Sequence, residues 1–174
     1  VRFGEKVHSP IVTPGEADAV VGLEKLEALR FAHYLNIETG TVLVNDHELV
    51  PGSVPNAESI YPRETIDFLK SKGMRVVGLP ASQTARDLGD ARMANVVMLG
   101  ALSTLLPIEQ EVWEKTLKLR IPAKYLDGNL KAFESGYDAM QKAISHEEHK
   151  GKKKNLLNLR DLCAFVVKRF LERS

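Results

Sequence analysis

Residues 16–46, with the sequence EADAVVGLEKLEALRFAHYLNIETGTVLVND, decide the fold of this chain. Ala17–Gly22 is a short, largely apolar stretch typical of a buried strand, and Leu23–Leu35 has apolar residues at helical spacing. Thr41–Asn45 is a second run rich in β-branched residues. Strand, helix and strand within about 30 residues predict a βαβ unit, in which the two strands are parallel.

The helix predicted for Leu23–Leu35 has one apolar stripe that we expect to face the core. The stripe consists of Ala28, Phe31, Ala32 and Leu35. Glu24 lies at the junction of strand and helix, where open α/β sheets commonly bind ligands. An acid in the first turn also stabilises the helix dipole without any ligand, and we favour this second interpretation.

The rest of the chain extends or covers this unit. Apolar periodicity, prolines and glycines predict a helix at 62–72, a strand at 74–79 and helices at 81–88, 91–106, 107–121 and 127–140. The fold class is therefore α/β, with three α/β/α layers, a mainly parallel Rossmann-like sheet and a helical C-terminal part. We divide the chain into a domain at 1–145, a charged linker at 146–154 and a C-terminal amphipathic helix at 155–174. The segment 1–12 is predicted to be extended.

Composition describes an ordinary globular protein with 174 residues, 44% apolar residues and a net charge of +1. Charge gives no general reason to expect a nucleic-acid or membrane partner. Cys163 is the single cysteine, so no intrachain disulfide forms and four thiolates for an iron–sulfur cluster are lacking. We expect a cytoplasmic protein. The chain begins at Val1 without a methionine, and a preceding segment is expected.

Familiar catalytic motifs are missing from the sequence. No G-x-S-x-G elbow, P-loop, H-E-x-x-H or C-x-x-C occurs. His146 and His149 have a spacing that zinc could use, but a solvated polar segment explains them better because zinc needs at least three ligands. The basic run at 150–154 is interpreted as a linker. The triplet at 127–129, Asp-Gly-Asn, resembles part of a diphosphate-binding motif but fits a helix start better.

Three polar residues are nevertheless candidates for binding. Arg2 can recognise a phosphate or carboxylate, because a guanidinium is permanently charged and binds such groups in a bidentate manner, although a solvated strand residue is the more common explanation. Asn45 ends the second predicted strand, at the edge where α/β sheets bind ligands, although asparagine is also common in turns. Asn95 interrupts an otherwise apolar helix, where a hydrogen bond to a neighbouring loop is the more common explanation.

The chain resembles the gamma domain of 2-oxoacid:ferredoxin oxidoreductases, and most closely the beta subunit of the indolepyruvate enzymes. The matching stretches occur in the same order over residues 1–143. They are VRFGEKVHSPI at 1–11, GEAD at 15–18, LEALR at 26–30, GTVLVN at 40–45, RMANVVMLGA at 92–101 and NLKAF at 129–133. The family normally begins with a strand and a G-x-G-G-Q-G turn upstream of Arg2, and this first unit is absent here.

The resemblance implies a subunit of an enzyme that oxidatively decarboxylates an aryl or other 2-oxoacid to an acyl-coenzyme A and reduces ferredoxin. It implies that this chain has no catalytic residue and no metal. Thiamine diphosphate and iron–sulfur clusters would belong to a larger partner subunit, with coenzyme A at the interface. The positions implied as ligand or subunit contacts are Arg2, Gly4, Ser9, Pro10, Glu16, Asp18, Asn45 and Asn95.

Two other functions remain open from the sequence. The chain could be a stand-alone module that binds a nucleotide or coenzyme A. It could also be an oligomeric scaffold, assembled through the apolar helix at 91–106 and the terminal helix.

Overall fold

The computed structural model describes residues 1–50, 52 and 61–149. The elements are the strands β1 (Ala19–Gly22), β2 (Thr41–Asn45) and β3 (Arg75–Leu79), the helices α1 (Lys25–Phe31), α3 (Thr65–Ser71), α4 (Ala81–Asp87), α5 (Ala94–Ser103), α6 (Gln110–Arg120) and α7 (Ala123–His149), and two short 3-10 helices, η1 (Ala32–Tyr34) and η2 (Ala91–Met93). The predicted C-terminal helix at 155–174 and most of the loop at 47–60 lie outside the described residues.

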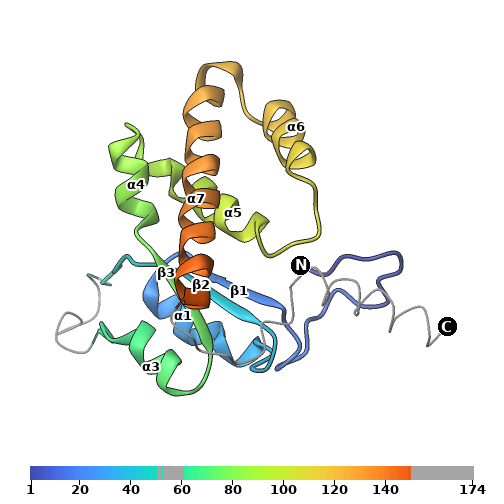
Figure 1. Ribbon diagram of the computed structural model, residues 1–174, viewed down its shortest axis with the longest axis vertical. Helices are drawn as coiled ribbons and strands as arrows, with labels where there is room; N and C mark the ends of the chain where they lie inside the picture. Colours follow the sequence, from blue (N-terminus) through green and yellow to red (C-terminus); the bar gives the residue numbers. More distant parts are fainter. Residues whose placement is uncertain (51, 53–60, 150–174) are drawn as a thin grey trace.

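The three strands form a parallel sheet in the order β1-β2-β3 (Figure 1). Ala19 lies opposite Thr41, and Thr41 lies opposite Arg75, so the strands start in register. β2 is the central strand, and all five of its residues are buried. The predicted βαβ unit is confirmed, and the strand at β2 has the bounds expected from the sequence.

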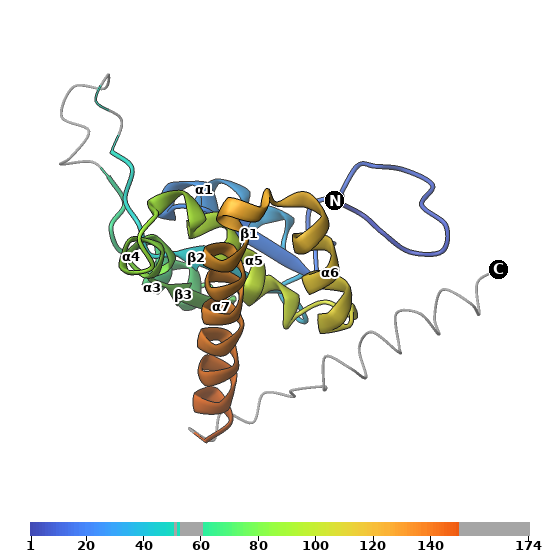
Figure 2. The same ribbon diagram turned by 90° about the horizontal axis from the view of Figure 1, so that it is seen from above.

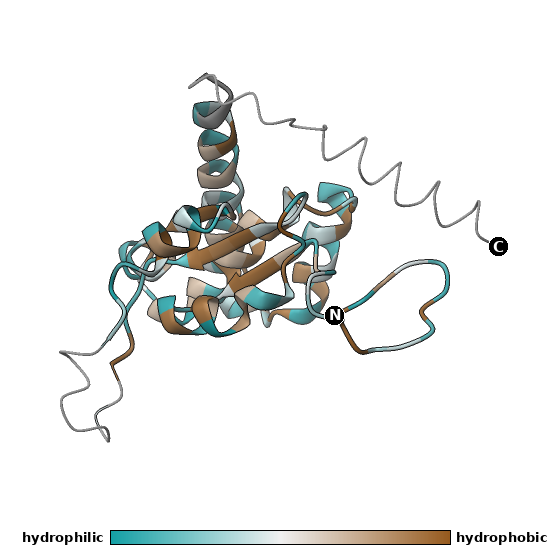
Figure 3. Ribbon diagram, turned by 90° about the horizontal axis from the view of Figure 1, so that it is seen from below, coloured by the Kyte–Doolittle hydropathy of each residue, from teal (hydrophilic) through white to brown (hydrophobic). Residues whose placement is uncertain are grey.

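Helices cover both faces of the sheet and complete the predicted three layers (Figures 1 and 3). On one face, α1 and α3 bury a core that includes Ala28, Leu69 and Val42. On the other face, α4, α5 and α7 bury a second core around Leu43 and Met98. The hydropathy view shows the strands as brown ribbons between the helical layers, as expected for a parallel sheet covered on both sides.

Helix α1 is shorter than the helix predicted at Leu23–Leu35. Glu24 is its N-cap residue, and η1 follows it from Ala32. Glu24 has extended dihedral angles, and its carboxylate accepts hydrogen bonds from the backbone N–H groups of Leu26 and Glu27. This agrees with the dipole interpretation of Glu24. Ala28 and Ala32 are buried as expected. The prediction that Phe31 faces the core is wrong, because this residue lies next to the start of η1 and is 44% exposed.

Helices α5 and α7 cross with their backbones in close contact. A Cβ atom on Gly136 of α7 would overlap the carbonyl oxygen of Val97, and one on Gly100 of α5 would overlap that of Phe133. Glycine at both positions therefore allows the two helices to approach each other. The predicted role of Gly100, close approach of another element, is confirmed.

Several predicted boundaries are wrong. Helix α7 begins before Asp127 and ends at His149, so the first residues of the linker predicted at 146–154 are helical. Helix α6 begins at Gln110 and not at Pro107. The segment 1–12 contains no strand and follows an irregular path.

Candidate functional site

The predicted binding residues lie in four separate parts of the molecule. Arg2, Gly4, Ser9, Pro10 and Glu16 belong to an N-terminal segment that we name the arm, residues 1–16. Asp18 follows the arm, at the amino end of β1. Asn45 lies at the opposite, carboxyl edge of the sheet, and Asn95 lies in the first turn of α5. The structure therefore brings five of the eight residues together and leaves three apart.

The arm is a loop that leaves the body of the protein and returns to it (Figure 2). Nη1 of Arg2 donates a hydrogen bond to the carbonyl oxygen of Ile11 at 2.9 Å, and Nη2 lies 4.0 Å from a carboxylate oxygen of Glu16. The Ser9 hydroxyl accepts a hydrogen bond from the backbone N–H of Ile11 at 3.2 Å. Arg2, Ser9 and Glu16 thus hold the loop in shape, while the Arg2 side chain remains 42% exposed.

Apolar side chains are exposed along the arm. Phe3, Val7 and Ile11 are exposed to 57%, 47% and 72%, and they are spaced four residues apart. Exposed apolar residues are common singly, but a group of them on a projecting segment is typical of an interaction surface. This spacing was visible in the sequence, but the projection of the arm from the body was not.

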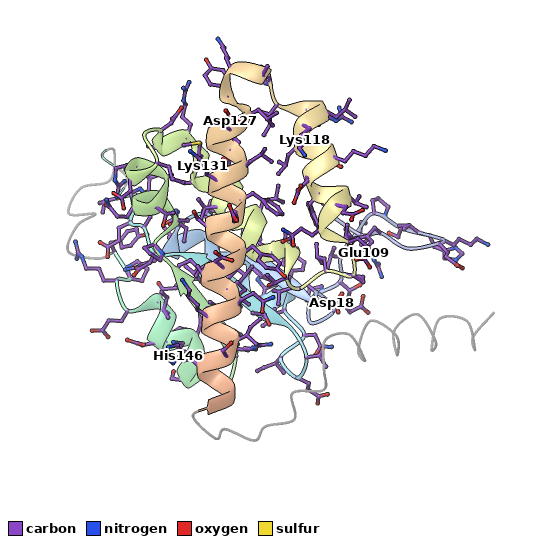
Figure 4. The ribbon with its side chains drawn as sticks, turned by 45° about the horizontal axis from the view of Figure 1, so that its top comes forward. Asp18, Glu109, Lys118, Asp127, Lys131 and His146 are labelled. Carbon is purple, nitrogen blue, oxygen red and sulfur yellow. The ribbon has the colours of Figure 1, made fainter. Side chains whose placement is uncertain are left out.

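The base of the arm is fixed to the body by backbone hydrogen bonds. The N–H groups of Gly15 and Ala17 donate to the carbonyl oxygens of His33 and Tyr34. The Asp18 carbonyl oxygen accepts from the N–H of Thr41, while the Asp18 side chain is exposed. Figure 4 shows Asp18 apart from His146, which lies near the C-terminal end of α7.

At the carboxyl edge of the sheet, the Asn45 side chain joins three segments of backbone. Its Nδ2 donates to the Leu23 carbonyl oxygen at 3.0 Å and to the Ser82 hydroxyl at 2.8 Å. Its Oδ1 accepts from the Ser82 backbone N–H at 3.1 Å. Asn45 is 3% exposed, so its amide has a structural role at the edge where a ligand was predicted.

A network of charged residues fills the same edge. The Lys25 ammonium lies 2.9 Å from Asp46 and 3.1 Å from Glu48, and Glu48 also contacts Arg63 at 3.2 Å. Hydrogen bonds to Asp46 raise the pKa of Lys25. Sequence reasoning missed this network, because Lys25 and Arg63 are brought together only by the turns that follow β1 and β2.

Tyr61 completes the cap of α1. Its hydroxyl donates a hydrogen bond to the Glu24 carboxylate and lies beside the N–H of Leu26. Burial, followed by this hydrogen bond to Glu24, raises the pKa of Tyr61 to about 12. Because folding raises this pKa, the protonated form of Tyr61 stabilises the fold. The stabilisation is complete at pH values below about 10, the pKa of tyrosine in the unfolded chain, and it is lost as the pH rises through about 12.

We therefore expect the stability advantage of the native chain over Tyr61→Phe to shrink at alkaline pH. Between pH 8 and pH 11 the difference in free energy of unfolding should fall by about 1 kcal/mol, because tyrosinate then favours the unfolded chain. Urea unfolding of both proteins at the two pH values measures it. An unchanged difference at pH 11 would show that folding does not raise the pKa of Tyr61.

Asn95 lies on a groove away from the arm. The groove has a volume of about 510 Å³ and is formed by the end of α4, the start of α5 and the first turns of α7. Gly128 and Asn129, from the triplet noted in the sequence, also line it. Sequence reasoning missed its charged and aromatic residues, Arg92, Lys124 and Tyr125, because the crossing of α5 and α7 brings them together.

Two features are absent from the described part of the chain. No cluster of three or more His, Cys, Asp or Glu residues that could hold a metal ion occurs among residues 1–50, 52 and 61–149. Within the same residues, none of the helices combines the length and apolar character that crossing a bilayer requires.

Comparisons with known proteins give a consistent answer. The family model described as pyruvate ferredoxin/flavodoxin oxidoreductase matches residues 1–139. Indolepyruvate oxidoreductase subunit IorB of Thermococcus kodakarensis is 32% identical over 151 residues, which are 83% of this chain and 73% of that protein. The gamma subunit of a keto/oxoacid ferredoxin oxidoreductase from Geobacter sulfurreducens has a solved structure with a TM-score of 0.54 and 25% identity, covering 75% of this chain and 68% of that one.

A third relative has a different chain organisation. Ketoisovalerate oxidoreductase subunit VorA of Methanothermobacter marburgensis is 32% identical over 152 residues, which are 84% of this chain but only 27% of that protein. In VorA, the matching region is thus a minor part of a much longer polypeptide.

Proposed function

Because the chain belongs to the pyruvate ferredoxin/flavodoxin oxidoreductase family, we propose that it is the subunit of a 2-oxoacid:ferredoxin oxidoreductase that lacks the catalytic centre. The complete enzyme would oxidatively decarboxylate a 2-oxoacid to an acyl-coenzyme A and transfer the electrons to ferredoxin. The identity with IorB supports indolepyruvate, or another aryl 2-oxoacid, as the substrate. A cytoplasmic location is part of this proposal and rests on the single cysteine, which suits a reducing compartment.

The residues of this chain do not fit the cofactors of such an enzyme. An iron–sulfur cluster usually takes four thiolates, and the chain has one cysteine. At the carboxyl edge of the sheet, Lys25, Asp46 and Glu48 are engaged with one another, and the Asn45 amide holds the backbone. We therefore assign thiamine diphosphate and the iron–sulfur clusters to a larger partner subunit and derive no catalytic step from this chain.

The organisation of VorA supports docking onto such a partner. The same region occurs as most of a separate chain in IorB and as a minor part of a long chain in VorA. When a region occurs as a separate chain in one protein and fused to further sequence in another, we expect it to contact the equivalent of that sequence in both. Fusion raises the effective concentration of two surfaces that already associate.

The arm is the part of this chain best suited to that contact. Phe3, Val7 and Ile11 offer apolar side chains, while Arg2 and Glu16 hold the loop in the shape that presents them. A loop that already has its bound shape loses less conformational entropy on binding. In this proposal, Gly4, Ser9 and Pro10 contact the partner together with the apolar residues.

The other predicted residues have less direct roles in the proposal. Asp18 extends the docking surface from the base of the arm, where its side chain is exposed. Asn45 keeps the turns after β1 and β3 together. Coenzyme A would reach the catalytic centre along the interface, and ferredoxin would contact the larger subunit.

The proposal is tested by co-expressing this chain with a larger subunit of the same enzyme from the same organism, with an affinity tag on the larger subunit alone. We expect the two chains to purify together without oxygen, and reduction of ferredoxin by indolepyruvate and coenzyme A to require both. The larger subunit alone should retain less than about a tenth of the rate, since a positioning partner contributes tenfold or more. Full activity without this chain would refute the proposal.

A further inference from the structure

Helix α6 (Gln110–Arg120) packs against the rest of the molecule along one side only. The centre of the Trp113 ring lies 6.0 Å from that of Phe133 on α7, and Leu117 is buried. In Figure 1, α6 lies at the outer edge of the molecule, with α7 on its inner side. The residues on the opposite face of α6 are exposed, so the described part of the chain leaves that face uncovered.

Two large apolar residues lie on the uncovered face. Val112 is 52% exposed and Leu119 is 78% exposed, and among the large apolar residues that the structure describes only Val1 is more exposed than Leu119. Because an α-helix has about 3.6 residues per turn, residues seven apart lie on the same face. Single exposed apolar residues are common, but two on one face, opposite the packed side, form a short stripe that another helix can cover.

Charged residues beside this stripe are separated by sign along the helix. Glu111 lies in the first turn of α6 and Lys118 in the last turn, and both are exposed. These two residues are also seven apart, so they lie on the same flank of the stripe. Lys118 contacts Glu114 of its own helix at 3.7 Å, but such exposed ion pairs are weak and leave the ammonium able to contact a second carboxylate.

We propose that α6 pairs with α6 of a second copy of this chain, antiparallel about a two-fold axis near Lys115. Val112 then packs against Leu119 of the second copy, and Glu111 lies beside Lys118 of the second copy. Each of these contacts occurs twice, because a two-fold interface is formed by the same surface on both copies. A parallel pair would bring like charges together, so the flanking charges select the antiparallel orientation.

The association is expected to be weak. Helix α6 has 11 residues, so the surface that it offers is small. The Lys115 side chains of the two copies also lie near the axis, where they must extend into solvent to keep their charges apart. We expect a dissociation constant of about 0.1 mM, as in transient contacts, so the chain is mostly monomeric at low micromolar concentration.

Sedimentation equilibrium of the full chain, at concentrations from 0.02 to 1 mM, tests the proposal. We expect the native chain to approach the mass of a dimer at the highest concentration. Leu119→Gln should raise the dissociation constant at least tenfold, because the lost apolar contact occurs twice in the dimer. Leu49→Gln is the matched control, since Leu49 is 66% exposed but lies outside α6, and it should leave the dissociation constant unchanged.

Charge reversals test the orientation. Glu111→Lys and Lys118→Glu should each weaken self-association, because each variant places like charges opposite each other twice. An equimolar mixture of the two variants restores both ion pairs, so it should form mixed dimers with a dissociation constant within about threefold of the native value. Mixing leaves the folding of each chain unchanged, and circular dichroism compares the helix content of the variants.

Other outcomes overturn the proposal. These are a native chain that remains monomeric at 1 mM, equal effects of Leu119→Gln and Leu49→Gln, and a mixture that associates no better than its components. If Leu119→Gln weakened binding to the larger subunit but left self-association unchanged, the face would belong to that subunit and not to a second copy. The main readout uses this chain alone, so its failure would leave the proposed subunit role intact.

Discussion

Gly136→Ala is expected to lower the free energy of unfolding by about 3 kcal/mol, although alanine favours helices more than glycine does. The new methyl group would overlap the carbonyl oxygen of Val97, which belongs to the backbone of α5 and cannot rotate away. The two helices must then separate, and the core around Met98 loses contacts. The melting temperature should fall by roughly 6–12 °C, as measured by calorimetry or circular dichroism.

Gly128→Ala is the matched control, because it changes glycine to alanine in the same helix. There the new methyl group would meet only the flexible end of the Met93 side chain, with the sulfur at 3.2 Å and the terminal carbon at 3.7 Å. We expect its stability to stay within about 1 kcal/mol of the native chain. Equal stability of the two variants would mean that α5 and α7 do not cross at Gly136.

Replacing apolar residues of the arm should have the largest effect on assembly. In Phe3→Asp/Ile11→Asp, two carboxylates replace side chains that are proposed to be buried against the larger subunit. Apolar anchors at the centre of an interface commonly contribute 2 kcal/mol or more each, so the complex should dissociate at least a hundredfold more readily. The fold should be unaffected, since both side chains are exposed in the isolated chain.

Phe68→Asp provides the control for the arm. Phe68 is also an exposed apolar residue, at 47%, but it lies on α3 and contacts Lys72. Surface plasmon resonance with the immobilised larger subunit compares the two variants. If Phe68→Asp weakened the complex and the arm variant did not, the docking surface would be on α3 and not on the arm.

The central part of the fold was predictable because its signals are local. The apolar runs at Ala17–Gly22 and Thr41–Asn45 are separated by a segment long enough for only one crossover helix, so a parallel pair followed directly. The three layers also followed from the alternation of strands and helices. Glu24 was correctly interpreted as a helix-dipole residue, because an acid in a first turn has a local explanation.

Other features depend on contacts between distant residues. Phe31 lies on the predicted stripe, but the chain turns into η1 next to it and leaves it partly exposed. Helix α7 continues past Gly136, a residue type that usually weakens helices, because α5 packs closely against that position. Tyr61 reaches Glu24 across 37 residues, and no local pattern indicates that pairing.

The candidate binding residues were predictable only in part. The resemblance singled out Arg2, Ser9 and Glu16, which the structure brings together, but it did not indicate that they hold one loop in shape. It also singled out Asn95 without the residues around it. The ring of Tyr125 joins Arg92 only through the crossing of α5 and α7, which sequence periodicity does not specify.

We propose that this chain acts by docking onto a larger subunit. The most direct test is the mass, by light scattering after size-exclusion chromatography, of the purified chain mixed with that subunit. We predict a single complex that contains both chains and is absent with Phe3→Asp/Ile11→Asp. Elution of this chain by itself at its own mass of 19.3 kDa, with the larger subunit unchanged, would contradict the claim.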